Sequence, residues 1–566
     1  MLRLALGTTL LAVLPLVRTS PVVSRQSTCH YLPTDSAWPS AAQWSELNQT
    51  VGGRLIRGVP LGQPCYPPQL DQAKCTQVQD EWTLLPPFIA DPVNVMSPYW
   101  MNDSCNPFFG PGGSCTLGNL AQYAINVSGS GDVLAGIHFA QNNNIRLTIK
   151  NSGHDFLGRS TGKGSLALWT HNLNQINFTT YSSSLYTGPA VKIGVGAEYE
   201  DVYPAAKAKG YRVVGGSCST VTVVGGFSQA AGHGPLGSLY GLGSDQVLEW
   251  EVVTATGQVM TASPTQNADL YRALAGGGPG NYAVVLSATV RAYPDGPVAG
   301  AGFTVANIGD STAYWAAITA WLQYLLVIDA IEGMTTVFTI TGGALELVFA
   351  TLPDTNSTAN IDAALSPFLN GLKTVNVSIS SSYESNVHPD YASHYAYWAP
   401  RQEYDSNITL GGGLIPRTVV QDDLPALVSV FKDITAGGAL ILSVGLNVIK
   451  GNLTANSVLP AWRTSLFTTT FARSLPVTST WDTIRSDQAQ LNAWQNELRT
   501  VTQGGAYMNE ATWDNPNWKD DYFGSNYNTL LTIKQKYDPK HVFWANAAVG
   551  SDQCSVSAAD GRLCCP

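Results

Sequence analysis

Apolar residues in the first half of the chain recur at helical spacing and then at strand spacing. Within residues 131–158, four of them repeat at the intervals of a helix turn: Val133, Leu134, Ile137 and Ala140. The next run, Ile145 to Ile149, is typical of a short strand, and a turn containing Gly153 follows it. The order helix, strand, glycine turn suits binding of a diphosphate, because glycine lets backbone N–H groups approach anionic oxygens.

In the second half, from about residue 300 to 495, strand-like runs alternate with helical patterns. The strand-like runs cover residues 342–352, 373–383, 438–449 and 464–472, and the helical patterns cover 310–326, 360–372 and 483–502. This alternation predicts an antiparallel sheet covered on one face by helices. A Pro- and Gly-rich break at residues 292–303 precedes it. The 566 residues exceed what one hydrophobic core usually supports, so we expect an α+β protein of two domains.

Two short motifs carry the candidate chemistry. KNSGHDFLGRS places His154 in one turn, and GGSCSTV places Cys218 in another. Between Gly215 and Gly243, nine glycines punctuate a run of small residues, which makes a poor core and a good wall for a ligand. A free cysteine is most often buried and inert, but the motif around Cys218 favours a functional role. If both side chains reach one cofactor, they can anchor it by two covalent bonds.

These motifs, with residues 232–257 and the tail from Tyr522 to Gly550, resemble the flavin-linked oxidases of the vanillyl-alcohol-oxidase superfamily. The resemblance is to the berberine-bridge-enzyme-like branch, and most to its secreted fungal isoamyl-alcohol-oxidase-like members. It implies a two-domain fold with a PCMH-type FAD-binding domain, and an FAD attached covalently through His154 and Cys218. It also implies hydride transfer from a CH–OH carbon to the FAD, followed by reoxidation with dioxygen to hydrogen peroxide.

By the same resemblance, residues around both motifs are expected to contact the FAD. They lie in the His154 turn, the Cys218 turn, the glycine-rich wall, a following strand and the tail: Lys150, Asn151, Ser152, Gly153, Asp155, Ser217, Ser219, Thr220, Gly225, Gly226, Gly232, His233, Gly234, Val252 and Asn546. For Asp155 an ordinary Asx-turn is the preferred alternative, and His233 could simply pack. Three departures from the family pattern are expected to put extra atoms near the flavin: Thr222, Ala230 and Ala231.

The proton acceptor is predicted from the motif GGAYMNE. Tyr507 stands where the family has a Tyr-x-Asn motif, with Asn509 as its companion, and a tyrosine can act as a base when its pKa is lowered. A core aromatic with a capped hydroxyl is an equally good interpretation. Many plant relatives carry a Glu on a second-domain strand, but the corresponding strand here offers Asn447. An aromatic segment, residues 388–400, either lines the cleft or packs between domains.

Charge and cysteine use restrict the class of protein further. A net charge of −10 argues against nucleic acid as a partner, and no CxxC pair or HExxH motif indicates a metal site. Residues 1–19 have the pattern of a removable signal peptide, and no later run is long and apolar enough for a membrane helix. Eight Asn-x-Ser/Thr sequons fit glycosylation. Removing Cys218 from the nine cysteines leaves eight for disulfides, whose pairing the sequence does not give.

The expected organisation is a signal peptide at 1–19, an FAD-binding domain at 20–295, a substrate domain at 296–498 and a C-terminal segment at 499–566 that returns to the first domain. The first domain would carry a disulfide-rich extension before about residue 117, and the active site would lie between the domains. We expect a secreted, monomeric oxidase of an alcohol-type small molecule. Three alternatives stay open: a same-fold oxidase of oligosaccharides or secondary metabolites, a dehydrogenase with an acceptor other than dioxygen, and a non-catalytic glycoprotein.

Overall fold

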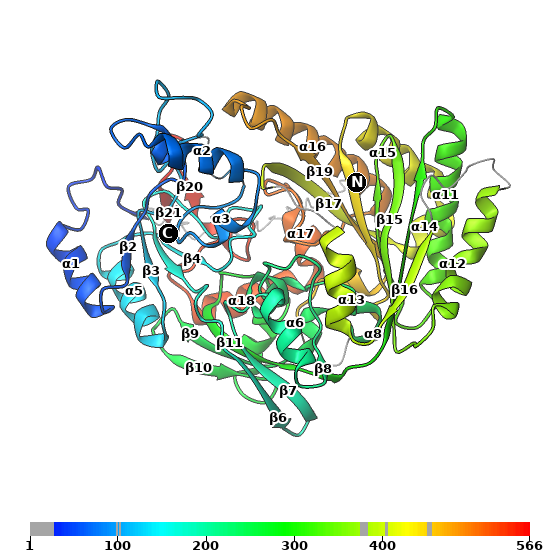
Figure 1. Cartoon of the computed structure of the whole chain (residues 1–566). Helices are drawn as coiled ribbons and strands as arrows, with labels where there is room; N and C mark the ends of the chain where they lie inside the picture. The colour runs from blue at the N-terminus through cyan, green and yellow to red at the C-terminus, as the bar shows by residue number, and fades with distance from the viewer. Residues whose placement is uncertain (1–27, 98–99, 101–103, 374–382, 402–405, 450–455) are drawn as a thin grey trace, which may run out of the picture.

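The computed structural model describes residues 28–97, 100, 104–373, 383–401, 406–449 and 456–566 (Figure 1). The predicted signal peptide, and residues 374–382 of the strand predicted at 373–383, lie outside these ranges.

The helix and strand predicted within residues 131–158 are confirmed. Helix α5 (Ser130–Asn142) buries Val133, Ile137 and Ala140, and strand β4 (Leu147–Lys150) begins two residues later than predicted. Strand β5 pairs in parallel with both β3 and β4, and β2 pairs antiparallel with β3, which gives the order β2-β3-β5-β4. The bounds are β2 Leu55–Arg57, β3 Tyr123–Asn126 and β5 Leu166–Trp169. The His154 turn leaves the carboxyl end of β4.

A five-stranded antiparallel sheet follows in the order β10-β9-β11-β7-β6. Its strands are β6 (Ile176–Ser182), β7 (Thr187–Gly194), β9 (Val247–Thr254), β10 (Val259–Ala262) and β11 (Ala283–Arg291). The Cys218 turn lies between α6 (Tyr199–Lys207) and β9, just before a π-helical turn at Val223–Phe227. Buried tyrosines fix this region, because Tyr203 donates a hydrogen bond to the carbonyl of Gly216 at 2.8 Å.

The second half forms a seven-stranded antiparallel sheet in the order β16-β13-β15-β14-β18-β19-β17. Its strands are β13 (Val298–Ala306), β14 (Thr335–Ile340), β15 (Ala344–Pro353), β16 (Glu384–His388), β17 (Ile408–Pro416), β18 (Leu440–Gly445) and β19 (Ser465–Ser474). The predicted runs at 342–352, 438–449 and 464–472 correspond to β15, β18 and β19. Strand β13 begins inside the Pro- and Gly-rich stretch at 292–303, which the sequence marks only as a break.

The three predicted helices cover one face of this sheet, and a further helix at 391–398, which the pattern does not predict, packs on the other face. Figure 1 shows α11 and α12 on its outer side, and α13 on the side of α6. Side chains cap the N-termini of two of these helices. The Asp310 carboxylate accepts a hydrogen bond from the backbone N–H of Ala313, and the Thr480 hydroxyl accepts one from the backbone N–H of Thr483. The bounds are α11 Ser311–Ile328, α12 Ala359–Leu372, α13 Tyr391–Trp398, α14 Arg417–Asp422, α15 Leu424–Ala436 and α16 Trp481–Thr502.

Helix α11 alone, among the described helices, has the length and hydropathy to span a membrane. Its large side chains, including Tyr314, Trp321 and Leu325, are buried in the core between the helices and the seven-stranded sheet. The composition of α11 is therefore that of a core helix.

The remaining elements are short or lie at the ends of the chain. They are α1 (Ala41–Thr50), α2 (Gln72–Glu81), α3 (Pro86–Ile89), α7 (Ser228–Ala230), α8 (Gly237–Tyr240), α9 (Gly243–Gln246), α10 (Ala268–Leu274), α17 (Trp518–Tyr522), α18 (Tyr527–Tyr537), β1 (Thr28–Cys29), β8 (Tyr211–Arg212), β12 (Tyr293–Pro294), β20 (Ser555–Val556) and β21 (Leu563–Cys565).

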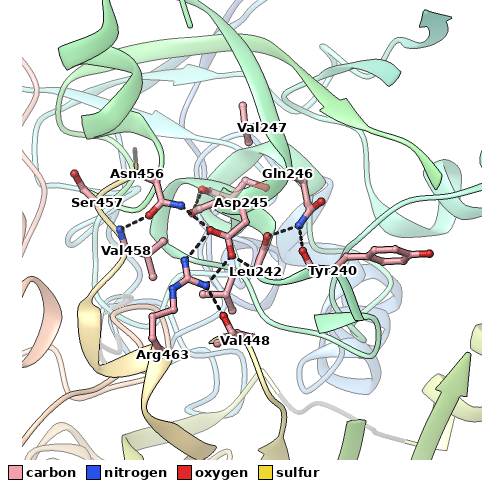
Figure 2. Close-up of polar contacts among 12 residues, drawn as sticks. Tyr240, Leu242, Asp245, Gln246, Val247, Val448, Asn456, Ser457, Val458 and Arg463 are labelled. Atoms are coloured by element: carbon pink, nitrogen blue, oxygen red, sulfur yellow. Dashed lines mark hydrogen bonds and ion pairs between the residues drawn. The ribbon is translucent and has the colours of Figure 1, made fainter. Parts of the chain in front are cut away.

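A buried ion pair joins the two halves of the chain (Figure 2). Asp245, in α9, is 1% exposed and accepts from both terminal nitrogens of Arg463, at 2.7 and 2.8 Å. The Asn456 amide and the Leu242 backbone N–H, at 2.6 and 2.9 Å, also donate to this carboxylate. The Arg463 side chain also donates to the carbonyl of Val448. It therefore connects α9 with residues 448 and 463 of the second half.

Four disulfides pair the eight cysteines other than Cys218, which is free. Cys65–Cys75 and Cys105–Cys115 close short loops near the N-terminus, and Cys554–Cys565 closes one at the C-terminus. Cys29–Cys564 joins the two ends, where β1 pairs with β21. One of the eight sequons is not a surface site, because Asn407 is 5% exposed and its amide donates to the carbonyl of Leu475.

Candidate active site

A cavity of about 340 Å³ lies between the loops of the first half and the seven-stranded sheet. Its lining includes the His154 turn, the Cys218 turn with the π-helical turn after it, three residues of the C-terminal segment (Tyr507, Asn509 and Glu510), and one face of β17, β18 and β19. It lies where the sequence places the active site, between the two halves of the molecule.

His154 and Cys218 come together in the cavity wall. The Cys218 Sγ lies 3.9 Å from the His154 Nε2, and that nitrogen lies 2.7 Å from the Thr220 hydroxyl. Burial, with the charge of Lys150, lowers the pKa of His154 to about 4, so its imidazole is neutral. Burial raises the pKa of the Cys218 thiol to about 11. Two side chains that are 64 residues apart in sequence can thus face the same ligand.

Lys150 and Asp155 hold the shape of the His154 turn. Lys150 is fully buried, and its ammonium donates to the carbonyls of Phe88 and Asp91 at 3.1 and 2.7 Å. Gly153 has φ +87°, and a Cβ there would lie 3.0 Å from the Lys150 Nζ. Asp155 accepts from the N–H of Leu157, which is an Asx-turn, and also from the N–H and hydroxyl of Ser160. Asp155 therefore makes the turn that the sequence favours, while its side of the loop lines the cavity.

The structure divides the fifteen further residues expected to contact FAD into two groups. Those that line the cavity are Asn151, Ser152, Gly153, Asp155, Ser217, Gly225, Gly226 and His233. Those outside its lining are Lys150, Ser219, Thr220, Gly232, Gly234, Val252 and Asn546. Thr220 contacts His154 directly, and Gly234 permits a close turn, because a Cβ there would lie 1.9 Å from the Gly215 carbonyl oxygen.

Of the three departures from the family pattern, one lines the cavity and two do not. Thr222 is buried and lines the cavity, as expected. Ala230 and Ala231 do not line it: both are packed in the hydrophobic core of the first half, so their extra atoms lie away from the cavity.

The aromatic segment near residue 390 packs between the two halves and is absent from the cavity lining. The Tyr395 hydroxyl donates to the Ser217 carbonyl at 2.8 Å, next to Cys218. Its ring meets that of Tyr203 edge-on, with the centroids 4.6 Å apart. Of the two interpretations of this segment, interdomain packing is the one that the structure supports.

Tyr507 and Asn509 both line the cavity. The Asn509 amide donates to the Tyr507 hydroxyl at 2.9 Å and to the Gly226 carbonyl at 3.1 Å. Tyr507 is 4% exposed, and burial, followed by the charge of Glu510, raises its pKa above the usual range. Tyr507 therefore keeps its proton and is better suited to donate a hydrogen bond than to accept a proton.

Sequence reasoning missed two charged residues of the cavity lining, Glu510 and Arg159. Glu510 lies 3.2 Å from the His233 Nε2 and accepts from the Thr470 hydroxyl at 3.2 Å. Arg159 is 8% exposed and donates to the Asn546 carbonyl at 3.0 Å. Glu510 stands three residues after Tyr507, and Arg159 stands five residues after His154. This closeness in sequence to predicted site residues is the signal that could have identified them.

The cavity has unused room and unused hydrogen-bonding capacity. The Arg159 Nη1 and the Asn151 Oδ1 are buried without a hydrogen-bond partner among the described residues. Such groups usually bond to a ligand or to water. Gly226 and Gly280 line the cavity, and a Cβ on either would meet only one neighbouring atom, at 3.8 or 3.9 Å. The space that these glycines leave, beside polar groups without partners, fits a large organic cofactor with polar edges.

The face of the seven-stranded sheet that closes the cavity is mostly aliphatic. Six residues from three neighbouring strands supply this surface, with Thr470 at its polar edge: Ile408, Leu410, Leu440, Leu442, Val444 and Ala472. In the ladder Leu442 pairs with Thr470, and Leu410 and Leu440 pair with Ala472, so these side chains share one face. We call these six residues the aliphatic wall.

Comparison with known proteins gives the class of this site. Residues 121–263 match the family described as FAD binding domain, and residues 506–550 match berberine and berberine like. The first match contains both His154 and Cys218, and the second contains Tyr507, Asn509 and Glu510. The chain is 38% identical to the FAD-linked oxidoreductase patO of Penicillium expansum, over 98% of this chain and 97% of that protein. It is 38% identical to the VAO-type flavoprotein oxidase VAO615 of Thermothelomyces thermophilus, over 95% of each.

Solved structures agree with the sequence matches. The VAO-type flavoprotein MtVAO615 from Myceliophthora thermophila superimposes with a TM-score of 0.91 at 36% identity, over 95% of this chain and 100% of that one. The glucooligosaccharide oxidase of Acremonium strictum, at 18% identity, has a TM-score of 0.62 over 76% of this chain and 92% of that one, which shows a shared fold alone. The fold and the site are those of an FAD-binding oxidoreductase. The chain belongs to the family of VAO-type, FAD-linked oxidoreductases with a berberine-like C-terminal segment.

Proposed function

We propose that this enzyme is an oxidase of alcohol-type donors that carries its FAD on two covalent bonds, through His154 and Cys218. The convergence of these two side chains, 3.9 Å apart in the cavity wall, is the observation that carries the proposal. Cys218 is also the one described cysteine outside a disulfide. The neutral His154 imidazole keeps a lone pair, as bond formation to a flavin requires.

The bound FAD would accept a hydride from the CH–OH carbon and pass the two electrons to dioxygen, giving hydrogen peroxide. The residues of this chain bind and orient the donor and move its hydroxyl proton. The Tyr507 hydroxyl, held by Asn509 and protonated because of its burial, is suited to donate a hydrogen bond to the donor oxygen. The Arg159 side chain, buried with one nitrogen free among the described residues, supplies positive charge beside the cavity.

The cavity favours a donor with an apolar body over an oligosaccharide. A donor that packs its apolar part on the aliphatic wall would remove apolar surface from water, which contributes about 25 cal/mol of binding free energy per Å² buried. The seven-stranded sheet contributes no aromatic side chain, on which sugar rings stack, to the described lining; the aromatic residues there come from the first half and the C-terminal segment: Phe156, Tyr199, Phe227 and Tyr507. The donor class that this supports is an aliphatic or aromatic alcohol, or a hydroxylated secondary metabolite.

We also propose that the enzyme is secreted. The pattern of residues 1–19 supports a signal peptide, and four disulfides support maturation in an oxidising compartment.

The test is an absorption spectrum of the purified protein before and after acid denaturation, followed by anaerobic titration with apolar alcohols, sugars and phenols. We expect a yellow chromophore that stays with the denatured chain, loses its colour with an apolar alcohol and recovers it in air with formation of hydrogen peroxide. A flavin bleached only by sugars would overturn the donor class, and one that recovers only with an artificial acceptor would make the enzyme a dehydrogenase.

A further inference from the structure

Two carboxylates line the cavity in the described part of the chain, Asp155 and Glu510. Asp155 is committed to its own loop, since one oxygen accepts from the Leu157 N–H and the other from the N–H and hydroxyl of Ser160. A carboxylate with both oxygens engaged in this way stabilises a turn and has little capacity to take a proton from a ligand. Glu510 is therefore the carboxylate that is left for chemistry in the cavity.

The position of Glu510 is fixed by contacts from two other parts of the fold. His233, in the glycine-rich wall, places its Nε2 at 3.2 and 3.3 Å from the two carboxylate oxygens. Thr470, on β19, donates its hydroxyl to Oε2 at 3.2 Å. An ionised carboxylate has about four acceptor positions, so these contacts orient Glu510 and leave at least one position free. The side chain is 32% exposed, which lets a donor molecule in the cavity reach it.

His233 is suited to orient Glu510. Its side chain is 12% exposed, and its ring packs against Tyr507 and Trp462, with centroids 5.1 and 5.8 Å away. The ring is thus fixed with Nε2 towards the carboxylate. Glu510 also lies at the polar edge of the aliphatic wall, because its partner Thr470 pairs with Leu442 in the ladder. A donor whose apolar body lies on that wall carries its hydroxyl towards Glu510.

We infer that Glu510, oriented by His233 and Thr470, is the group that accepts the hydroxyl proton of the donor. In this step Glu510 becomes a carboxylic acid as the O–H bond of the donor breaks. A bound FAD would take the hydride of the same carbon with its electron pair, and the alcohol would leave as an aldehyde or ketone. Tyr507 keeps its proton throughout and holds the donor oxygen by a hydrogen bond. The inference rests on the proposed function, since it requires a donor with an ionisable hydroxyl.

The experiment replaces Glu510 by an isostere that cannot take a proton. Glu510→Gln, Tyr507→Phe and the control Glu497→Gln, which makes the same chemical change on the exposed side of α16, are purified with their flavin. Three quantities are measured: the anaerobic rate constant of flavin reduction at saturating alcohol, the Kd of an analogue whose hydroxyl is replaced by hydrogen, and Tm. The analogue, whose binding shifts the flavin spectrum, reports on the cavity without turnover.

We expect Glu510→Gln to lower the reduction rate constant by about 10²–10⁴-fold, with the analogue Kd and Tm unchanged. Tyr507→Phe should lower it less, and Glu497→Gln should leave it unchanged. If Glu510→Gln does not hold its flavin, Glu510→Asp keeps a carboxylate at a shifted position and should retain slow reduction. A rate constant for Glu510→Gln within threefold of wild type, or a larger loss in Tyr507→Phe, overturns the assignment and leaves the proposed oxidase function intact. Wild-type flavin that no alcohol reduces would overturn both.

Discussion

Removing the arginine of the buried ion pair in Figure 2 should destabilise the protein far more than removing an exposed cation. In Arg463→Met the carboxylate of Asp245, 1% exposed, loses the two N–H donors at 2.7 and 2.8 Å. The donors that stay are the Asn456 amide and the Leu242 N–H. The negative charge then stays buried without its counter-charge, which is a costly situation in a protein interior.

The size of the effect follows from these contacts. Breaking a buried pair from one side costs about 3–5 kcal/mol, and hydrogen bonds to charged groups contribute about 1.5–3 kcal/mol each. The Arg463 side chain is 19% exposed, so water replaces part of what is lost, and we take the lower limit, about 3 kcal/mol. At about 2–4 °C per kcal/mol, the value for a unit of 150–250 residues such as the predicted substrate domain at 296–498, Tm should fall by about 6–12 °C.

The assay is a thermal scan of oxidised, flavin-loaded protein at one fixed scan rate. Lys536→Met is the matched control, because it removes a cation from the exposed pair with Asp269, whose side chains are 59% and 36% exposed. Such a pair contributes at most about 1 kcal/mol, and its loss should shift Tm only slightly. The double variant with Asp245→Asn should recover part of the loss, because no unpaired charge is then buried. Equal Tm values for Arg463→Met and Lys536→Met would refute this reasoning.

Two further predictions concern the flavin bonds and a buried carboxyl. Cys218→Ala should keep its flavin through His154 after denaturation, and His154→Ala should keep it through Cys218; free flavin released from both single variants would contradict two bonds. Burial, helped by the charges of Glu200 and Asp201, raises the pKa of Glu198 from 4.5 to about 8, so the folded state holds a proton that the unfolded chain releases over this range. Stability should therefore fall as pH rises from about 5 to 8, and Glu198→Gln should flatten the decline of Tm; parallel curves for the two proteins would argue against it.

The sequence predicted elements best where spacing alone determines burial. Helix α16 lies at Trp481–Thr502, within two residues of the predicted 483–502, and the aliphatic stretches became β15, β18 and β19. Strand β13 was missed because its glycines are typical of a break. The structure shows their reason: a Cβ at Gly300 would lie 2.1 Å from the indole nitrogen of Trp398, so this strand needs glycine for a close approach.

For the site, the family resemblance predicted that His154 and Cys218 face one ligand, and both residues line the cavity. Pattern alone could not find Glu510 as a partner of His233, because these residues are 277 positions apart and meet only through the fold. Nor could it show that Ala230 and Ala231 point into the core. The role of Tyr507 as a base stays a prediction, which the comparison of Glu510→Gln with Tyr507→Phe tests.

The bond between Cys29 and Cys564 sets an order of events during biosynthesis. A ribosome releases Cys29 early, and 535 residues separate it from its partner. Strand β1 likewise has no neighbour until β21 emerges at the far end of the chain. Cys29 therefore waits for the synthesis of residue 564 before it can pair, and removal of residues 564–566 would leave both Cys29 and Cys554 as reactive thiols.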